Sequence, residues 1–198
     1  ADNCDYLMFT GSSATGSHLA EHAGRRLIGF SAELGGKNAM IVAQGANLDK
    51  VAKAATRACF SNAGQLCISI ERIYVPAAMW DSFTTRFAAA TKKMKLSGAL
   101  DYSADMGSLI SEKQLKTMTR HVDDAVSKGA EVLYGKRAEG ALFHPTVVDK
   151  IPYTCELVHE ETFGPVLPML PFDDIREAVT LVNDREKPLA LYYFGPEK

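Results

Sequence analysis

Cys67 is the side chain best suited to covalent chemistry on a carbonyl group. It follows Gly64-Gln65-Leu66 in a predicted loop between a helix and a strand, and loops of this kind hold catalytic groups over a rigid scaffold. A thiolate attacks carbonyl carbon well when its pKa is depressed or a base lies nearby. The commonest role of a free cysteine is that of a small buried hydrophobe, and the local sequence alone favours that role.

Glu33 is the candidate base. It closes an apolar segment that runs from Leu27 to Leu34, and two glycines follow this segment. Partial desolvation at such a position would raise the pKa of the carboxyl group toward the range that is useful for proton transfer. When the residue is taken alone, a strand-end charge that reaches solvent is the simpler interpretation.

Two further motifs are candidates for cofactor binding. In Glu160-Glu161-Thr162-Phe163-Gly164-Pro165, acidic groups beside an aromatic ring could hold a sugar diol and stack a ring, although a polar turn before a strand is the simpler interpretation. In Gly11-Ser12-Ser13-Ala14-Thr15-Gly16, a glycine turn that opens a helix could present backbone N–H groups to a phosphate. This segment is neither a Walker A motif nor a complete G-x-G-x-x-G, so it is a weak signal alone.

Metal chemistry is not expected. The four cysteines form no Cys-x-x-Cys pair and are too sparse for a disulfide scaffold. Cys59 is predicted on the apolar face of a helix, where it would be a buried hydrophobe. The histidines offer only the i, i+4 pair His18/His22, which falls on a predicted polar helix face.

The elements that must position these residues alternate between strands and helices. Tyr6–Phe9 is expected to form a strand, followed by the glycine turn, a helix over Ser17–Arg26 and a strand over Leu27–Leu34. Later strands are predicted over Ala39–Val42, Arg72–Val75, Glu131–Tyr134, Val166–Leu170 and Leu189–Phe194. Later helices are predicted from Asp49 as cap to Asn62, from Pro76 to Met94, from Ser111 as cap to Gly129, and over Asp174–Val182. The apolar face of the helix that Ser111 caps is expected to carry Leu115, Met118, Val122 and Val126. This alternation predicts an α/β fold with a largely parallel sheet flanked by helices, and the paired glycines Gly35-Gly36 suit a hinge between domains.

Length and composition agree with a soluble globular chain. The 198 residues are 46% apolar and 23% charged, which is enough for one domain and part of another. The net charge of −2 gives no bulk attraction to nucleic acid or to an acidic membrane. The apolar runs are shorter than the roughly 18 residues that span a bilayer, and the N-terminus carries acids where a signal peptide is basic. A cytoplasmic protein without nucleic-acid or membrane partners is expected.

Four motifs, in this order and spacing, resemble the aldehyde dehydrogenase superfamily. They are Phe9-Thr10-Gly11-Ser12, Glu33-Leu34-Gly35-Gly36-Lys37-Asn38, Gly64-Gln65-Leu66-Cys67 and Glu161-Thr162-Phe163-Gly164-Pro165. Each is modest alone, and the set is highly specific. The resemblance covers the middle-to-late part of a family sequence, well under half of it. It implies that residues 1–34 are the C-terminal remnant of an NAD(P)-binding, Rossmann-like domain, and that residues 35–198 are a catalytic domain that is incomplete at its C-terminus.

The resemblance implies a role for each matching position. Cys67 resembles the nucleophile that forms a thiohemiacetal with an aldehyde, and its backbone N–H resembles an oxyanion donor. Hydride transfer to the nicotinamide of NAD or NADP leaves a thioester, and Glu33 resembles the base that activates the thiol or the hydrolytic water. The cofactor-binding positions implied are Gly11 and Ser12 at the phosphates, Glu161 at the nicotinamide ribose, Phe163 beside the nicotinamide, and Leu34.

The two ends of the chain resemble different branches of the family. The stretch from Asp2 to Val75 is similar to the succinate-semialdehyde dehydrogenases, whereas Asn183 to Tyr192 is similar to the enzymes of long-chain or aromatic aldehydes. Natural divergence and a chimeric origin both stay open, as does an acyl-CoA-forming reaction. The expected partner is a small aldehyde, and the parent protein is expected to be a homo-oligomer.

Segments that the family uses early in its sequence have no match here, including a side-chain oxyanion donor. Loss of one such donor costs about 10²–10³ in rate, so the 198-residue chain alone is expected to be a poor dehydrogenase. Two other functions stay open. One is a non-catalytic fold module, in which Cys67 would be no more reactive than Cys59. The other is a cofactor-independent esterase or thioesterase that uses the same thiol and base. The presence of both Cys67 and Glu33 favours the dehydrogenase.

Overall fold

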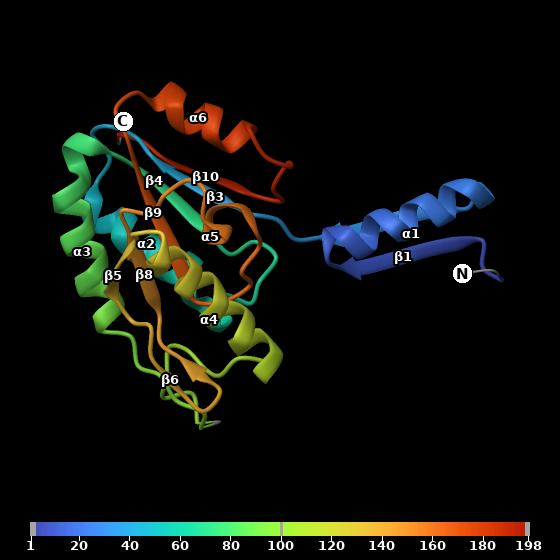
Figure 1. Cartoon of the computed structure of the whole chain (residues 1–198), viewed down its shortest axis with the longest axis horizontal. Helices are drawn as coiled ribbons and strands as arrows, with labels where there is room; N and C mark the ends of the chain where they lie inside the picture. The colour runs from blue at the N-terminus through green and yellow to red at the C-terminus, as the bar shows by residue number, and fades with distance from the viewer. Residues whose placement is uncertain (1–2, 100, 197–198) are drawn as a thin grey trace.

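The computed structural model describes residues 3–99 and 101–196, which form a six-stranded sheet flanked by helices and a small projecting unit (Figure 1). The projecting unit comprises β1 (Tyr6–Gly11), α1 (Ser13–Arg26) and β2 (Gly29–Leu34). Its two strands are parallel along their whole length. The glycine-containing segment before β3 (Ala39–Val42) joins this unit to the main body.

Helix α1 begins four residues earlier than predicted. The prediction placed Gly16 in a turn and the helix start at Ser17, but Gly16 is buried inside the helix. The physical reason is the cap: Ser12 has an extended backbone, and its side chain accepts a hydrogen bond from the Thr15 N–H at 3.3 Å. A serine in this position satisfies an N–H group of the first turn that would otherwise lack a partner.

The main sheet has the strand order β10-β3-β4-β9-β8-β5. Its strands are β10 (Leu191–Phe194), β3, β4 (Arg72–Pro76), β9 (Val166–Phe172), β8 (Thr146–Asp149) and β5 (Glu131–Tyr134). Neighbouring strands are parallel, apart from the antiparallel pair of β8 and β5. The predicted α/β fold with a largely parallel sheet is therefore confirmed. A small hairpin of β6 (Ala138–Glu139) and β7 (Leu142–Phe143) lies apart from this sheet.

Two further predicted helix starts are wrong. Helix α2 (Leu48–Phe60) is capped by Asn47, whose side chain accepts from the Lys50 N–H at 3.2 Å, and Asp49 lies in its first turn. Pro76 does not open a helix, because β4 continues through it in register with β9. A short 3₁₀ turn, η2 (Ala77–Met79), follows, and α3 begins after it (Trp80–Lys92).

Helix α4 (Glu112–Ser127) is capped by Ser111 as predicted. Met118, Val122 and Ala125 are buried, whereas Val126 is 38% exposed, contrary to the predicted apolar face. Met118, Val122 and Ala125 have the spacing i, i+4, i+7, which places them along one side of a helix with 3.6 residues per turn. Val126, one residue further on, therefore lies at the edge of this buried stripe. The remaining elements are η1 (Ser61–Gly64), α5 (Glu156–His159) and α6 (Ile175–Asn183), the last capped by Asp174.

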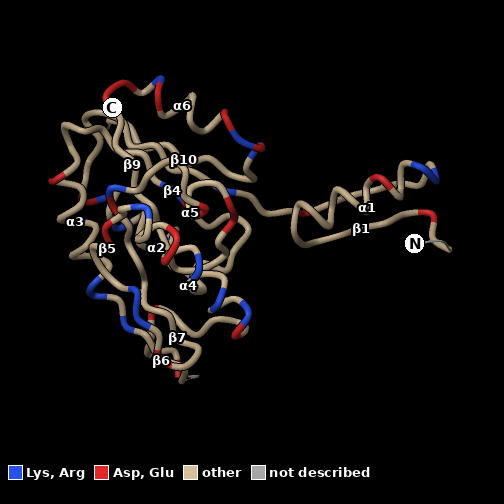
Figure 2. Tube along the Cα trace, in the orientation of Figure 1, with Lys and Arg blue, Asp and Glu red and all other residues tan. Residues whose placement is uncertain are grey.

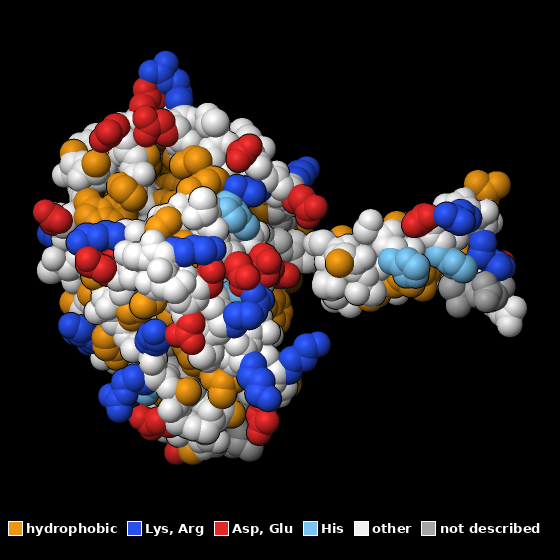
Figure 3. All heavy atoms as spheres, viewed as in Figure 1, with side chains coloured by type: hydrophobic (Ala, Val, Ile, Leu, Met, Phe, Trp, Pro, Cys, Tyr) orange, Lys and Arg blue, Asp and Glu red, His pale blue; other side chains and the backbone are white. Residues whose placement is uncertain are grey.

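Charged residues lie mainly on the helices and loops, and few lie on the strands of the main sheet (Figure 2). On the face shown in Figure 3, acidic and basic side chains are interspersed. Among the described residues, no helix combines the length and apolar character that crossing a bilayer requires.

The core beneath α2 and α3 contains stacked aromatic rings. The Phe87 ring lies 5.5 Å from that of Phe83 and 6.1 Å from that of Phe60, measured between centroids, and all three side chains are fully buried. Such offset stacks add to the free energy gained from burial.

Phe87→Ala is expected to lower the free energy of unfolding by about 3–5 kcal/mol, because it leaves a cavity where two rings lose their partner. Urea unfolding followed by circular dichroism measures this loss. Ile110→Ala is the control, since the Ile110 side chain is 83% exposed and its truncation should change stability by no more than about 0.5 kcal/mol. Equal losses in the two variants would contradict the prediction.

Candidate active site

One cavity of about 410 Å³ is lined by every residue that the sequence predicted for catalysis or cofactor binding. These residues come from the ends of β1 and β2, from the loop before β4 and from the loop before β9. The lining consists of Thr10, Gly11, Ser12, Glu33, Leu34, Gly35, Cys67, Gln114, Thr117, Glu161, Thr162 and Phe163. Segments that are far apart in the sequence thus meet at a single site.

Cys67 is exposed in the loop between η1 and β4. The amide of Asn38 holds this loop: its Nδ2 donates to the carbonyl oxygens of Cys67 at 2.8 Å and Ser69 at 2.9 Å. The Asn38 Oδ1 accepts from the Ala190 N–H at 2.8 Å. One buried amide therefore ties the candidate nucleophile to the start of β3 and to the chain that enters β10.

The thiols of Cys59 and Cys155 are poor nucleophiles. Burial, reinforced by the negative charge of Glu71, raises the pKa of the Cys59 thiol well above its ordinary value. Burial also raises the pKa of Cys155. A thiol must ionise to attack. Burial therefore disfavours attack by Cys59, which occupies the buried helix position predicted for it, whereas Cys67 is exposed.

Gly64 brings the Cys67 loop against the loop that precedes β9. Its φ of +68° is in the left-handed region, and a Cβ at this position would collide with the carbonyl oxygen of Gly164. Glycine avoids both the collision and the strain of a positive φ. The contact fixes the distance between the segments that carry Cys67 and Phe163.

Glu33 lines the cavity from the end of β2, but its predicted partial desolvation is wrong. The side chain is exposed. The physical reason is its place in a two-stranded sheet, where the residues of β2 are exposed or half-buried rather than covered by packing on both faces.

Glu161 is held in the cavity wall by the paired glycines. The Gly36 N–H donates to Glu161 Oε1 at 2.9 Å, and a Cβ at Gly35 would collide with the same carboxylate. Burial raises the pKa of Glu161, and the hydrogen bond from Gly36 opposes this rise. The two glycines predicted as a hinge thus also hold the carboxylate of Glu161 in the cavity wall.

A buried polar network beneath the cavity was missed by the sequence reasoning. Glu71 Oε2 accepts from Lys37 Nζ at 2.8 Å and from the Thr162 N–H at 2.7 Å, and its Oε1 accepts from the Phe163 N–H at 2.8 Å. Lys37 Nζ also donates to Thr162 Oγ1 at 3.1 Å. A usable signal was present, because a glutamate within an apolar strand segment must find a partner when it is buried.

Helix α4 supports the same loop from the other side. Gln114 Nε2 donates to the carbonyl oxygens of Thr162 and Phe163. His121 Nδ1 lies 3.2 Å from Thr162 Oγ1, and burial lowers the pKa of this imidazole. Phe163 has a φ of +50°, a conformation that costs a non-glycine residue free energy and needs such support.

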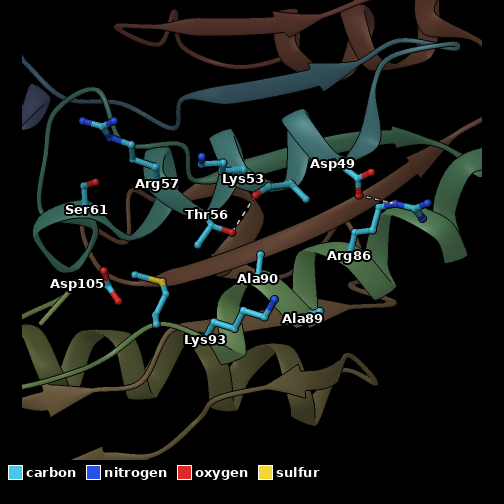
Figure 4. A pocket seen from close by; sticks show the side chains of 12 residues that line it. Asp49, Lys53, Thr56, Arg57, Ser61, Arg86, Ala89, Ala90, Lys93 and Asp105 are labelled. Carbon is cyan, nitrogen blue, oxygen red and sulfur yellow. Dashed lines mark hydrogen bonds and ion pairs between the residues drawn. The ribbon is translucent and has the colours of Figure 1, made fainter.

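Two other features lie outside this site. A cavity of about 730 Å³ between α2 and α3 has a different lining, with Asp49 and Arg86 paired at one end at 2.9 Å (Figure 4).

Among the described residues, His121, Glu156 and Glu160 form the one group close enough to share a metal ion. Arg120 contacts all three, so its guanidinium occupies the place that an ion would need.

Residues 1–197 match the aldehyde dehydrogenase family, and the chain belongs to it. A protein of Mycobacterium ulcerans with the provisional name succinate-semialdehyde dehydrogenase [NADP(+)] 2 is 65% identical over 94% of this chain and 37% of its own. Glutarate-semialdehyde dehydrogenase of Pseudomonas putida is 40% identical over 96% of this chain and 40% of its own. The chain therefore spans about two fifths of these curated relatives.

Solved structures agree. A protein of Anabaena variabilis with the provisional name aldehyde dehydrogenase PutA superposes with a TM-score of 0.93 at 38% identity, covering 98% of this chain and 42% of its own. Succinate-semialdehyde dehydrogenase from Burkholderia pseudomallei gives a TM-score of 0.93 at 33% identity, over 98% and 41%. The family resemblance and the predicted fold are confirmed. The similarity of the chain's tail to the long-chain or aromatic branch stays a prediction.

Gly64→Ala is expected to destabilise the protein by at least about 1–2 kcal/mol, because alanine pays for the left-handed φ and its Cβ meets the Gly164 carbonyl. Thermal unfolding of the variant measures the loss. Gly98→Ala is the matched control, since a Cβ there has nothing within 4 Å. Indistinguishable melting temperatures for the two variants would show that the loops do not touch as described.

Glu161→Gln is expected to change how stability depends on pH. The raised pKa means that folded Glu161 binds its proton more tightly than the unfolded carboxyl does, so its contribution is lost as pH rises from the ordinary value of 4.5 through the raised pKa. Glutamine does not titrate and keeps an oxygen for Gly36. Relative to this variant, the wild type should lose stability across that window in urea unfolding. Parallel profiles would contradict the prediction.

Proposed function

We propose that this chain carries the catalytic thiol and base of an enzyme that oxidises an aldehyde to a carboxylic acid with NAD or NADP. The observation that carries the proposal is the single cavity, in a member of the aldehyde dehydrogenase family, lined by Cys67, Glu33 and the predicted cofactor residues. A nucleophile, a base and groups suited to a dinucleotide meet there.

The cavity fits the nicotinamide end of a dinucleotide. Gly11 and Ser12 stand at the start of α1, where the N-terminus of a 14-residue helix favours a phosphate. The fixed carboxylate of Glu161 can accept hydrogen bonds from a ribose diol, and Phe163 and Leu34 offer apolar surface to a ring. When bound, the cofactor accepts the hydride.

In the proposed mechanism, the Cys67 sulfur attacks the aldehyde carbon, forms a C–S bond and leaves the carbonyl oxygen as an oxyanion. The backbone N–H of Cys67 donates to this oxyanion. Glu33 takes the proton from the thiol. Collapse of the oxyanion would leave a thioester on Cys67, with the hydride passing to the nicotinamide that the cavity would hold. Once Glu33 has released the thiol's proton to solvent, it deprotonates a water molecule that attacks the thioester carbon, and the C–S bond breaks to give the acid and the Cys67 thiolate.

The names of the relatives support a narrower class of substrate, and the two sheets support a division into domains. Both names indicate a semialdehyde that carries a carboxylate, such as succinate semialdehyde, and the name of the Mycobacterium ulcerans relative indicates NADP as the cofactor. We propose residues 1–34 as part of a cofactor domain and 35–198 as part of a catalytic domain, supported by the separate two-stranded and six-stranded sheets. We also propose that the enzyme acts as a cytoplasmic homo-oligomer on a small aldehyde, without nucleic-acid or membrane partners.

Cys67→Ala is expected to abolish aldehyde-dependent formation of reduced cofactor, and Glu33→Gln to lower it by about 10²–10⁴, the usual contribution of a general base. Absorbance of the reduced nicotinamide measures both. Cys59→Ala is the control, since that thiol is buried in α2, and it should keep activity. Retained activity in Cys67→Ala would refute the proposal. Ester hydrolysis that depends on Cys67 but needs no cofactor would instead indicate an esterase.

A further inference from the structure

Glu71 is a buried acid that holds the cavity wall through both of its carboxylate oxygens. Its side chain is 2% exposed, and both carboxylate oxygens accept from the consecutive backbone N–H groups of Thr162 and Phe163. Its own backbone N–H donates to the Asn38 carbonyl at 3.0 Å, which anchors Glu71 where β3 and β4 meet. A rigid part of the sheet therefore grips a loop through one carboxylate.

Lys37 makes this burial tolerable. Its ammonium group, 5% exposed, lies 2.8 Å from Glu71 and 3.1 Å from the Thr162 hydroxyl. A buried carboxylate without a counter-charge would be strongly unfavourable, whereas a paired and fully hydrogen-bonded one is retained. Both oxygens of Glu71 accept in these contacts, which is what the Lys37 donor and two adjacent backbone N–H donors require.

The loop that Glu71 grips carries one lining residue in an unfavourable backbone conformation and another whose side chain is held by a hydrogen bond. Phe163 has a positive φ, and Glu161 must face Gly36 across the cavity wall. Without an acceptor for their N–H groups, Thr162 and Phe163 would leave buried donors unpaired or rearrange. The position of both lining side chains thus depends on a residue that is itself outside the cavity lining.

We propose that Glu71 is a positioning residue, whose carboxylate fixes the Glu161–Phe163 segment so that Glu161 and Phe163 face a bound nicotinamide cofactor beside Cys67. The inference rests on the proposed function for the cofactor contact. It goes beyond that function because it makes the geometry of the cofactor contact depend on Glu71, a buried acid directly before β4.

The first test is amide hydrogen exchange resolved to single residues, on the wild type and on Glu71→Gln. Glutamine keeps one acceptor oxygen but places an NH₂ donor against the second N–H. Exchange at Thr162 and Phe163 is expected to accelerate about tenfold, the effect of losing one charge-assisted hydrogen bond. Buried amides of β9 and α3 should keep their wild-type rates.

Two variants keep this test decisive. Glu71→Asp retains the charge but shortens the side chain, so it should fold and accelerate the same two amides less than Glu71→Gln does. Phe83→Leu is the control for general destabilisation, because Phe83 is buried in the aromatic stack. It should accelerate exchange broadly without singling out Thr162 and Phe163. Unchanged exchange at these two amides in both Glu71 variants, or acceleration only in step with the core, would overturn the proposal.

The second test separates positioning from the cofactor assignment. Protection of Cys67 from slow alkylation is titrated with NADP⁺, and Glu71→Gln is expected to raise the half-protecting concentration about tenfold while the cofactor-free alkylation rate stays within twofold. If NADP⁺ protects the wild type and Glu71→Gln equally, the positioning role is wrong. If NADP⁺ protects neither protein, the cofactor assignment fails in this chain, and the exchange result alone decides whether Glu71 fixes the segment.

Discussion

The buried ion pair of Lys37 and Glu71 connects the segments on which the candidate site depends. Lys37 lies just before β3, Glu71 just before β4, and their shared partner Thr162 lies in the loop before β9. These three strands are neighbours in the central sheet. The pair therefore lies at the starts of neighbouring parallel strands. Its hydrogen bonds hold the loops that reach the cavity in fixed positions relative to the sheet. Charges this deep in a protein are stable only as a complete set, so removal of one partner affects every loop that the set holds.

Close backbone packing performs the same function in the places where the polar network does not reach. Gly64 admits the carbonyl of Gly164, and Gly35 admits the carboxylate of Glu161. Asn38 then fastens the Cys67 loop through its carbonyl oxygens. Each contact demands a residue without a side chain or with a short amide, so glycines that suit a hinge in the sequence make specific close contacts in the structure. The glycine pair at residues 35 and 36 shows this most clearly, because it connects the two sheets and also holds the carboxylate of Glu161.

Much of the fold was predictable because hydrophobic patterns and capping residues are local signals. The alternation of strands and helices, the parallel sheet and the Ser111 cap followed from them, whereas strand β8 of the main sheet was not predicted. The errors came from competition between neighbouring signals: Ser12 and Asn47 provide the caps in place of later candidates, and strand pairing carries β4 through Pro76. The motifs identified the lining residues, whereas Glu71 and Gln114 were missed, because their partners are 91 and 48 residues away in the sequence. Such pairing is decided by the fold.

The two acids of the cavity have environments that suit different work. Glu161 is half-buried, and Gly36 fixes one of its oxygens, so it offers a stationary acceptor to a ligand. Glu33 is exposed at the end of β2, where its carboxylate is open to solvent. A proton-transfer group in the proposed cycle must act twice, once on the thiol and once on water, and must return its proton to solvent between the steps. A fixed, desolvated carboxylate is poorly suited to that exchange. The difference in solvent access therefore supports the proposal that Glu33 transfers protons and Glu161 binds a ligand, although the two carboxylates share one cavity.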